Sequence, residues 1–422
     1  MKILVISALP YDISSTTRAF DTYFNFVKKE DLAQIFTNPS YPSFDKCNNY
    51  FQITDKDVIK SLFKKREQAG IALEANNKEK PLPSSNNKSS NRLSFFLKKD
   101  LGILHLIRAS IWNKKRWYSP QLQKWLKDFS PDLIFYHNSN SIFLTNMALT
   151  IQKELNIPLV TEISDDYYFC KKNPFSLYNS IYKKRTRYLL NQSNGVIFIS
   201  EKMKNKYSLF NLKNSDFVHI CSNEENVNNC NDQDKTICFY GNIGLNRYKT
   251  IRLFAKYLYR ENIGSIDVYC PRLGNSDLSK IEKVNGINYC GSLDYKMLMK
   301  AIMSYKMVLI AEPLDKKTAN YISLSLSTKI SDSLLLAKPI VAIGRQECGT
   351  IDFLTAHECA VVINNSSDFP KFNKFLDDTL LQNKIKNNAR RVYKEEFSFE
   401  RNSKKAFNIL EKACRDYYVV EE

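Results

Sequence analysis

A glycine-containing segment near the middle of the chain has the residue types needed to bind a diphosphate. In FYGNIGLNRYK (239–249), an apolar run ends, and Gly241 and Gly244 allow the backbone to turn tightly before a predicted helix. That helix would carry Arg247 and Lys249 in its first turns. Backbone N–H groups, a helix N-terminus and two cations would then face one place, an arrangement that suits a diphosphate.

A second candidate site lies in SLSTKISDSLLLAKPIVAIG (325–344), where a hydroxyl and a cation begin a predicted helix. Ser327 is the expected N-cap, Lys329 lies in the first turn, and Asp332 faces inward about one turn later. The hydroxyl and the cation suit a phosphate, and the carboxylate can accept hydrogen bonds from two ribose hydroxyls.

Both segments also allow a purely structural interpretation. The first is neither a Walker P-loop nor a G-x-G-x-x-G fingerprint, so it also fits a glycine turn followed by solvated surface cations. The second also fits a capped amphipathic helix with a solvated aspartate. The order and setting of the two segments favour the binding interpretation.

The elements that must position these residues alternate between strands and helices. Short apolar runs rich in β-branched residues predict strands at 2–7, 132–137, 158–163, 195–200, 236–241, 265–270, 286–291, 306–312 and 339–344. Helical periodicity lies between them, at 140–158, 248–262, 295–305 and 327–338. Continuous apolarity is typical of strands covered on both faces, so we predict an α/β protein with doubly wound parallel sheets.

The chain is long enough for two such sheets. Its 422 residues exceed what one hydrophobic core usually serves, and the alternation restarts after residue 231. We predict a first Rossmann-like domain over 1–222, an Asn-rich linker over 223–235 and a second Rossmann-like domain over 236–422. It stays open whether the final helix packs back on the first domain. A polar tract at 76–91 predicts a long exposed loop.

The net charge indicates an anionic partner. The chain has 62 Lys and Arg against 44 Asp and Glu, a formal charge of +18. Residues 56–130 hold 17 basic and 6 acidic side chains, and residues 171–206 hold 9 and 1, so the positive field belongs to the first half. Nucleic acid, a membrane surface or a phosphorylated substrate would supply the negative charge.

Cysteine and histidine usage indicates a reducing compartment and no metal site. The 10 Cys form no C-x-x-C pair, and none of the 4 His belongs to an H-E-x-x-H motif. We therefore expect no metal and a cytoplasmic location. The N-terminal apolar run is too short for a signal peptide, and the apolar stretch 101–112 is interrupted by His105 and Arg108, so no membrane span is predicted.

These motifs resemble those of bacterial GT-B glycosyltransferases of the group 1, family-four-like kind. The second domain of that family opens with strand-G-x-x-G and basic residues, as TICFYGNIGLNRYK (236–249) does, and later carries a segment similar to STKISDSLLLAKPIV (327–341). In the first half, SPDLIFYH (130–137) resembles the family's P-D-hydrophobic strand, and NIPLVTEISDDY (156–167) resembles its P-hydrophobic-V strand. The similarity covers most of the chain.

The resemblance implies a GT-B fold, in which two Rossmann-like domains face each other across a cleft, and a metal-independent glycosyltransferase that retains anomeric configuration. The nucleotide-sugar is then a substrate, so no cofactor is expected, with its diphosphate held by Arg247 and Lys249 and its ribose by Asp332. The full set of predicted donor-binding residues is Gly241, Asn242, Gly244, Arg247, Lys249, Ser327, Thr328, Lys329 and Asp332. Cations in place of a metal ion would stabilise the leaving nucleoside diphosphate.

The predicted catalytic residues are Asp165, His137 and Glu312. The chain departs from the family pattern at Leu324, where one of two paired glutamates is expected, and at Ser164, where a histidine often precedes the aspartate. If configuration were inverted, a base would have to reach the acceptor hydroxyl, and His137, Glu162, Asp165 and Asp166 stand at predicted strand ends. A structural histidine that closes a strand is the alternative for His137.

Residues 92–117 combine aromatic and basic side chains in a pattern typical of a helix at a membrane surface. Phe95, Phe96 and Trp112 would enter the headgroup zone while the cations face lipid phosphates. The alternative is a helix that packs its apolar stripe on the domain core and leaves its cations in solvent.

The combined prediction is a cytoplasmic enzyme associated peripherally with the inner face of the plasma membrane. It would transfer a sugar from a nucleotide-sugar to a glycan or lipid-linked acceptor during the synthesis of capsule, O-antigen or lipopolysaccharide. One alternative is a nucleotide-sugar-modifying enzyme of GT-B shape, such as a 2-epimerase, and another is a basic nucleic-acid-binding protein. The charge is not interleaved along a recognised nucleic-acid-reading module, so we expect no nucleic acid partner.

Overall fold

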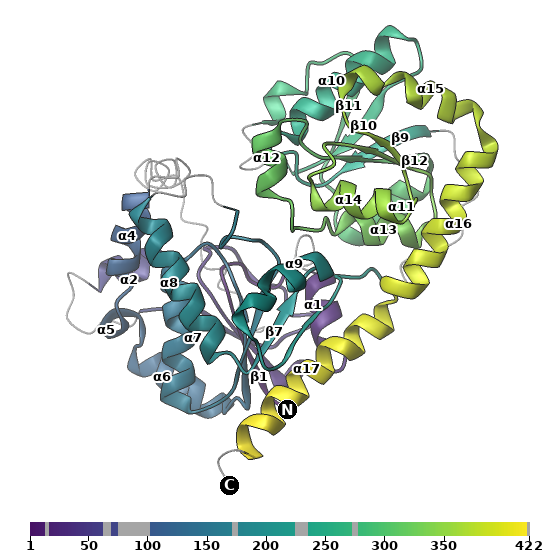
Figure 1. Ribbon diagram of the computed structural model, residues 1–422. Coiled ribbons are helices and arrows are strands. Elements are labelled where there is room, and N and C mark those ends of the chain that lie inside the picture. Colours follow the sequence, from purple (N-terminus) through teal and green to yellow (C-terminus); the bar gives the residue numbers. More distant parts are fainter. Residues whose placement is uncertain are drawn as a thin grey trace. The chain divides into compact units, whose positions relative to one another are not determined.

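The chain folds into two compact units (Figure 1). Unit 1 comprises Met1–Asp12, Tyr23–Val218 and Ser403–Glu422, and unit 2 comprises Ile13–Thr22 and His219–Asn402. In this computed structural model the described residues are 1–12, 17–61, 69–74, 102–170, 176–223, 235–271 and 277–419. The predicted loop at 76–91 and most of the predicted linker at 223–235 lie outside the described residues.

Unit 1 is built on a sheet with the strand order β4-β3-β2-β1-β5-β6-β7-β8. Neighbouring strands pair in parallel, except that β3 and β4 are antiparallel. The strands are β1 (Ile3–Ser7), β2 (Leu32–Phe36), β3 (Asn49–Gln52), β4 (Ile71–Leu73), β5 (Leu133–His137), β6 (Leu159–Ile163), β7 (Gly195–Phe198) and β8 (Ser215–Phe217). The central strand β1 is buried along its whole length, as expected for a strand covered on both faces.

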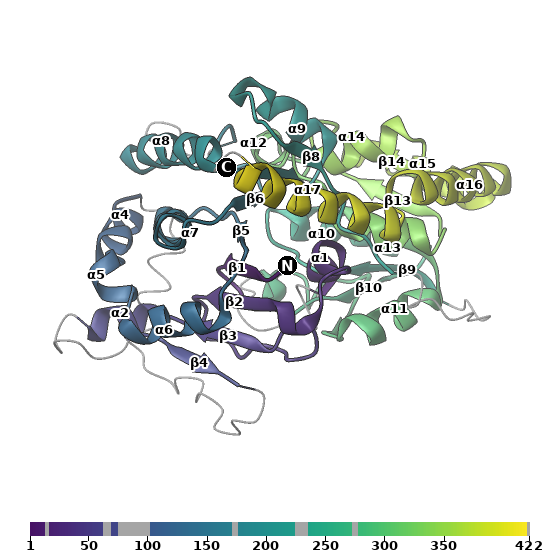
Figure 2. The ribbon, with the colours of Figure 1, turned by 90° about the horizontal axis from the view of Figure 1, so that it is seen from below.

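Helices and short 3-10 turns connect the strands of unit 1. They are η1 (Lys29–Asp31), α2 (Asp55–Lys60), α4 (Gly102–Ile111), α5 (Lys114–Trp117), α6 (Pro120–Phe129), α7 (Ile142–Leu155), α8 (Leu177–Gln192), α9 (Glu201–Tyr207), η2 (Ser208–Phe210) and α17 (Phe399–Val419). Helix α1 (Thr17–Phe24) begins in unit 2, which includes Ile13–Thr22, and ends in unit 1. Most of α17 belongs to unit 1 and lies near the N-terminus (Figures 1 and 2). There the Asn214 side-chain amide donates to the Ile409 carbonyl over 3.1 Å, and Cys414 Sγ lies 3.4 Å from Met1 Sδ.

Unit 2 is built on a parallel sheet with the strand order β11-β10-β9-β12-β13-β14. The strands are β9 (Lys235–Tyr240), β10 (Ile266–Tyr269), β11 (Ile287–Gly291), β12 (Tyr305–Ala311), β13 (Ile340–Ile343) and β14 (Val361–Ile363). The helical elements are α10 (Arg247–Arg260), η4 (Leu278–Lys280), α11 (Tyr295–Met303), α12 (Lys316–Tyr321), α13 (Lys329–Leu335), α14 (Gly349–Ala356), η5 (Ser366–Asp368), α15 (Pro370–Asp377) and α16 (Thr379–Glu396).

The prediction of doubly wound parallel sheets is confirmed in both units. Every strand expected from an apolar run is present, with small shifts at its ends. Strands β2, β3, β4, β8 and β14 were not predicted. In β2 the buried Gln34 interrupts the apolar run, and its carboxamide oxygen accepts a hydrogen bond from the Tyr11 amide over 2.9 Å. Such a strand does not give the continuous apolar signal of its neighbours.

The aromatic and basic segment at 92–117 packs its tryptophans into the core of unit 1. Trp112 is 3% exposed, stacks on Phe143 with ring centroids 4.3 Å apart, and donates its indole N–H to Asp55 over 2.7 Å. Trp117 is buried as well. The prediction that Trp112 enters a lipid headgroup zone is therefore wrong, because its ring already fills a protein core. Residues 92–101, with Phe95 and Phe96, lie outside the described residues.

Candidate functional site

A tight turn follows β9 in unit 2 and brings the backbone against a lysine side chain. Gly241 has φ of +95°, and a Cβ at this position would lie 2.6 Å from Lys329 Cε. Its amide donates to the Tyr269 carbonyl over 2.8 Å, and the Gly244 amide donates to the Asn242 side chain over 2.7 Å. Only glycine fits the first position, since any side chain would both strain the backbone and displace Lys329.

Helix α10 begins at Arg247, which forms an ion pair with Glu312 at the end of β12. Arg247 Nε lies 2.8 Å from Glu312 Oε2, and the carboxylate is only 1% exposed. The N-cap residue, Asn246, is fixed by hydrogen bonds from its amide to Asp315 and Thr318. Because the start of the helix is anchored in this way, the guanidinium is held at the carboxyl end of β12.

Lys329 supplies a second buried cation beside this pair. The residue is 8% exposed, and its ammonium lies 4.3 Å from the centroid of the Phe239 ring. Among the described residues, this ammonium donates to no hydrogen-bond acceptor. Burial, followed by the neighbouring charge of Arg247, lowers the pKa of Lys329 to about 7, although Glu312 acts in the opposite direction. A dianionic ligand would give this ammonium the partner that the described protein groups do not give it.

Asp332, on α13, is completely buried and has donors within unit 2. Ser222 Oγ and the Tyr295 hydroxyl donate to Oδ1, the latter over 2.8 Å, and the Arg18 guanidinium donates to Oδ2. The prediction that Asp332 faces inward is confirmed. Its ribose-binding role stays a prediction, and because the carboxylate is fully buried, a ribose hydroxyl would reach it only after one of the surrounding groups moved.

The remaining predicted donor-binding residues are spread around this cluster. Thr328 is the N-cap of α13 and makes no side-chain capping bond, so the prediction of Ser327 as the N-cap is wrong. The Ser327 amide instead donates to the Thr350 hydroxyl over 3.0 Å. Asn242 and Lys249 are exposed, and the Lys249 ammonium lies 5.9 Å from the Tyr248 ring centroid. The structure therefore gathers Gly241, Arg247, Lys329 and Glu312, and it places Lys249 on another face of α10.

Unit 1 carries a histidine–glutamate pair at the carboxyl ends of adjacent strands. His137 ends β5 and is paired in register with Glu162 of β6. Its Nδ1 contacts the Glu162 carboxylate, which is fully buried and also accepts a hydrogen bond from the Tyr23 hydroxyl over 3.2 Å. Burial disfavours the charged imidazole, yet the Glu162 carboxylate, with Asp165 beyond it, raises the pKa of His137 above its ordinary value.

The two adjacent aspartates after β6 have different environments. Asp165 is exposed and accepts a hydrogen bond from the Tyr167 hydroxyl over 3.1 Å. Asp166 is buried and accepts hydrogen bonds from three consecutive backbone amides, at 168–170, and from the Tyr207 hydroxyl. Asp166 therefore holds the loop together, and Asp165 is the one of the two whose carboxylate reaches solvent.

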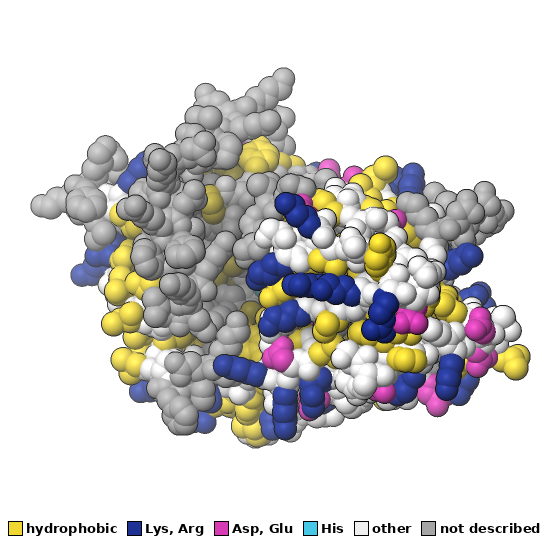
Figure 3. Space-filling view, turned by 90° about the horizontal axis from the view of Figure 1, so that it is seen from above, with side chains coloured by type: hydrophobic (Ala, Val, Ile, Leu, Met, Phe, Trp, Pro, Cys, Tyr) yellow, Lys and Arg dark blue, Asp and Glu magenta, His cyan; other side chains and the backbone are white. Residues whose placement is uncertain are grey.

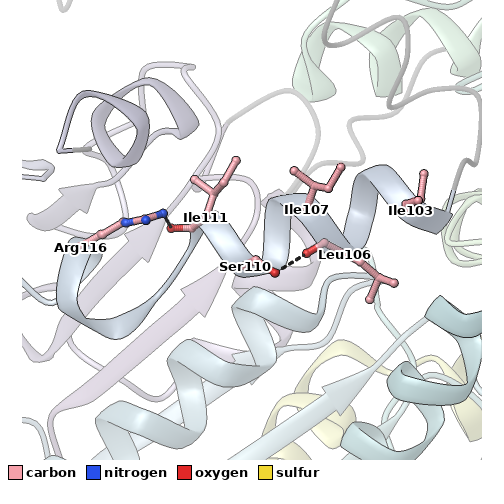
Figure 4. Close-up of a pocket in the computed structure, with 6 residues that line it drawn as sticks. All are labelled: Ile103, Leu106, Ile107, Ser110, Ile111 and Arg116. Atoms are coloured by element: carbon pink, nitrogen blue, oxygen red, sulfur yellow. Dashed lines mark hydrogen bonds between the residues drawn. The ribbon is translucent and has the colours of Figure 1, made fainter. Parts of the chain in front are cut away.

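Helix α4 presents an apolar groove on the surface of unit 1. The groove is lined by Ile103, Leu106, Ile107, Ser110, Ile111 and Arg116 (Figure 4). The three isoleucines point to the same side of the helix in Figure 4, and two of them, Ile103 and Ile107, are 67% and 50% exposed. Ile107 and Ile111 belong to the apolar residues of the 92–117 segment that the sequence analysis considered, and in the structure they line this groove while Trp112 is buried.

Two further findings bear on membranes and metals. No helix within the described ranges has the length and apolarity needed to cross a bilayer. Over the same ranges, no three His, Cys, Asp or Glu side chains gather in a way that could hold a metal ion.

Basic side chains gather on the described part of the face in Figure 3, with some acidic side chains among them.

Comparisons with known proteins agree with the fold. Residues 100–222 match the family model of Glycosyltransferase Family 4. Sucrose-phosphate synthase from Thermosynechococcus elongatus is similar with a TM-score of 0.62 and 10% identity, over 97% of this chain and 98% of that chain. HepE from Anabaena, in complex with UDP-glucose, has a TM-score of 0.61 and 11% identity, over 97% and 99%. A glycosyltransferase from Rickettsia africae has a TM-score of 0.58 and 12% identity, over 98% and 98%. No curated protein sequence matches the chain.

These matches confirm the resemblance to GT-B glycosyltransferases that the motifs predicted. The chain has the GT-B fold, since the structural similarity extends over nearly its whole length. Residues 100–222 also have sequence similarity to a glycosyltransferase family. Sequence identities of 10–12% show that the fold is shared but do not identify the substrate.

Proposed function

We propose that the protein is a glycosyltransferase that moves a sugar from a nucleotide-sugar to a glycan or lipid-linked acceptor in the synthesis of a cell-surface glycan such as capsule, O-antigen or lipopolysaccharide. The observation that carries the proposal is the pair of cations beside the Gly241 turn at the strand ends of unit 2, the partly buried Arg247 and the buried Lys329. A buried ammonium that makes no hydrogen bond to the described residues favours an anionic ligand at this place. HepE, a similar structure, contains UDP-glucose.

The proposed reaction needs charge stabilisation more than a strong nucleophile. As the bond from the anomeric carbon to the phosphate oxygen breaks, the electron pair stays on the nucleoside diphosphate. The acceptor hydroxyl oxygen forms the new bond, and its proton passes to the departing phosphate oxygen. Arg247 and Lys329 would stabilise that growing negative charge in surroundings where water screens it poorly. We propose that configuration is retained and that neither a metal ion nor another cofactor takes part.

His137 is the best placed residue for an acceptor-side role. It is partly exposed, and its Nδ1 is fixed by Glu162, which leaves Nε2 as the nitrogen available to an acceptor hydroxyl. Asp165 is the nearby carboxylate that reaches solvent. We propose that these two residues orient the acceptor in unit 1.

The membrane part of the proposal rests on helix α4. The exposed isoleucines of α4, with Arg116 of α5 lining the same groove, combine an apolar surface with a cation, which fits peripheral attachment to an anionic membrane surface such as the inner face of the plasma membrane. Such attachment would bring a lipid-linked acceptor to the enzyme from the cytoplasmic side.

A donor panel tests the proposed function directly. Isothermal titration with UDP-, GDP- and CMP-sugars should show binding of one diphosphate sugar, while the CMP-sugars, which carry a single phosphate, act as the matched control. Incubation of the selected donor with a lipid-linked acceptor should release the nucleoside diphosphate and extend the glycan. Conversion of the donor without any acceptor would instead identify an epimerase, and tight salt-sensitive duplex binding with no donor binding would identify a nucleic-acid-binding protein.

A further inference from the structure

A cation that the sequence analysis did not single out lies in the same part of unit 2. Arg18 stands in α1, and the stretch Ile13–Thr22 belongs to unit 2, although the rest of the chain up to Val218 belongs to unit 1. The N-terminal part of α1 therefore contributes to the unit that carries Arg247 and Lys329. No pattern in the sequence connects Arg18 with a segment 310 residues away.

The guanidinium of Arg18 is held by one of its two terminal nitrogens. Nη1 donates both to the Asp332 carboxylate and to the Thr328 carbonyl, the latter over 3.0 Å. Cζ lies 5.2 Å from the centroid of the Tyr295 ring, within the range of a cation–π contact. The position of the Arg18 side chain is thus fixed by Asp332 on α13, the Thr328 carbonyl just before α13 and the Tyr295 ring on α11.

The other edge of the guanidinium has no such partner. Within the described ranges, Arg18 Nε and Nη2 donate to no acceptor, and the side chain is 20% exposed while Asp332 is fully buried. A guanidinium offers five N–H donors in a rigid planar fork, so one edge can hold a carboxylate while the other binds an oxyanion. Asp332 is thereby in a position to orient Arg18 without meeting the ligand itself.

The net charge of the residues around Lys329 favours the binding of an anion. The cations Arg18, Arg247 and Lys329 stand near the carboxylates of Asp332 and Glu312, and the charges of all four neighbours act on Lys329. While Lys329 is protonated, three positive and two negative charges leave an excess of one positive charge in this largely buried cluster, which is unfavourable until an anion enters. The edge of Arg18 formed by Nε and Nη2 adds two donors to that cluster.

We propose that Arg18 is a ligand of the donor diphosphate and that Asp332 is its positioning residue, in place of a ribose contact. This inference rests on the proposed function of the Arg247 and Lys329 site. It assigns a binding role to α1 and gives a reason for a carboxylate to be buried beside a phosphate site, where a lone negative charge would repel the ligand.

The test compares three probes that separate the diphosphate from the ribose. Inorganic pyrophosphate, UDP and uridine are titrated into the wild-type protein and into the variants Arg18→Lys and Asp332→Asn. The lysine keeps a positive charge for Asp332 but has no second edge, so its pyrophosphate and UDP affinities should fall by about tenfold. Uridine affinity should stay unchanged. Asp332→Asn should give the same pattern because the guanidinium is no longer held.

The double variant and a distant cation supply the controls. If Asp332 acts through Arg18, Arg18→Lys/Asp332→Asn loses no more pyrophosphate affinity than either single variant, a non-additive result. Arg260→Ala removes an exposed cation at the far end of α10 and should leave all three affinities unchanged. Thermal unfolding of each variant confirms that it is folded.

Three results would overturn the inference. Unchanged pyrophosphate affinity in folded Arg18→Lys excludes Arg18 as a ligand. A loss of uridine affinity in Asp332→Asn restores the ribose assignment. Wild-type protein that binds neither pyrophosphate nor any nucleotide-sugar contradicts the proposed function together with this inference, whereas wild-type binding with an unaffected Arg18→Lys contradicts only the role of Arg18.

Discussion

Arg247 and Glu312 form an ion pair across 2.8 Å, and the carboxylate of that pair is almost completely buried. A buried carboxylate beside a phosphate site is unfavourable by itself, but here it fixes a guanidinium whose other donors remain available to a ligand. The pair therefore preorganises a cation, so that little energy is spent on moving it when charge develops on the leaving group. A catalytic role for Glu312 stays a prediction from the sequence. Its observed contact with Arg247 positions the guanidinium.

Replacement of Arg247 tests this electrostatic role. Arg247→Ala should lower kcat by about a hundredfold and change donor affinity less, because charge on the diphosphate is greatest in the transition state. Steady-state kinetics with the selected nucleotide-sugar measure both quantities. Lys249→Ala is the informative comparison, since Lys249 is exposed on the same helix. A variant of Arg247 that raises only KM would show that the cation contributes to ground-state binding alone.

The titration of Lys329 should couple donor binding to pH. The pKa of Lys329 is lowered to about 7, so the empty site is cationic below this pH and neutral above it. Donor affinity should therefore fall as pH rises through about 7, and binding above that pH should take up a proton. A nucleotide-sugar is the right probe because its diphosphate does not titrate in this range. Lys329→Arg should bind the donor with an affinity that does not fall near pH 7. The same fall in that variant would assign the titration to another group.

The same shift has a consequence for stability. An unfolded lysine keeps its ordinary pKa, so between about 7 and that ordinary value the unfolded state binds more protons than the folded state. The free energy of unfolding should increase with pH across this window. Lys329→Met removes this pH-dependent contribution. The variant should be more stable than the wild-type protein, by an amount that is largest below pH 7 and shrinks as pH rises.

The His137–Glu162 pair gives a separate pH prediction for unit 1. The pKa of His137 is raised by its carboxylate neighbours, so its stabilising contribution is complete at low pH and is lost as pH rises through the folded-state pKa. Glu162→Gln keeps the shape and removes the charge, so the imidazole should titrate at lower pH by NMR. If His137 contacts the acceptor, the acidic limb of the rate profile should move in the same direction. An unmoved imidazole titration would contradict the pairing.

The sequence predicted the framework of the fold because buried parallel strands leave a strong local signal. The apolar runs that became β1, β5, β9 and β12 are continuous, and the glycine turn after β9 occurs where a strand meets a helix. Edge strands such as β8 are half-buried and polar, so their positions depend on pairing with a neighbour and not on their own composition.

The site was predicted only as far as its residues are local in sequence. Gly241, Arg247 and Lys329 could be found because each belongs to a recognisable strand–turn–helix segment. Arg18 and the hydroxyl donors to Asp332 come from distant parts of the chain, and their contact is decided by tertiary packing. The burial of Trp112 was missed for a related reason, since an amphipathic basic helix looks alike whether its apolar side meets lipid or protein.

The packing of Trp112 predicts a large loss of stability on truncation. Trp112→Ala removes the stack on Phe143 and the hydrogen bond to Asp55, and should lower the free energy of unfolding by about 4 kcal/mol. Trp112→Phe keeps most of the apolar contact and should cost much less. Denaturant unfolding followed by circular dichroism measures both variants. A change near zero in the free energy of unfolding of Trp112→Ala would contradict the burial of this ring.

The exposed isoleucines of α4 give the prediction for membrane attachment. The purified protein should co-sediment with anionic liposomes, less with neutral ones, and less as salt rises, because both apolar burial and charge contribute to binding at an interface. Ile103→Ser/Ile107→Ser should reduce sedimentation even at low salt while leaving the protein folded, since neither side chain is buried. Leu380→Ser is the matched control, because Leu380 is 82% exposed on α16 of unit 2 and its loss should change nothing. Equal reduction by both variants would mean that general surface apolarity drives binding, and full binding by the α4 variant would exclude this helix as the site of attachment.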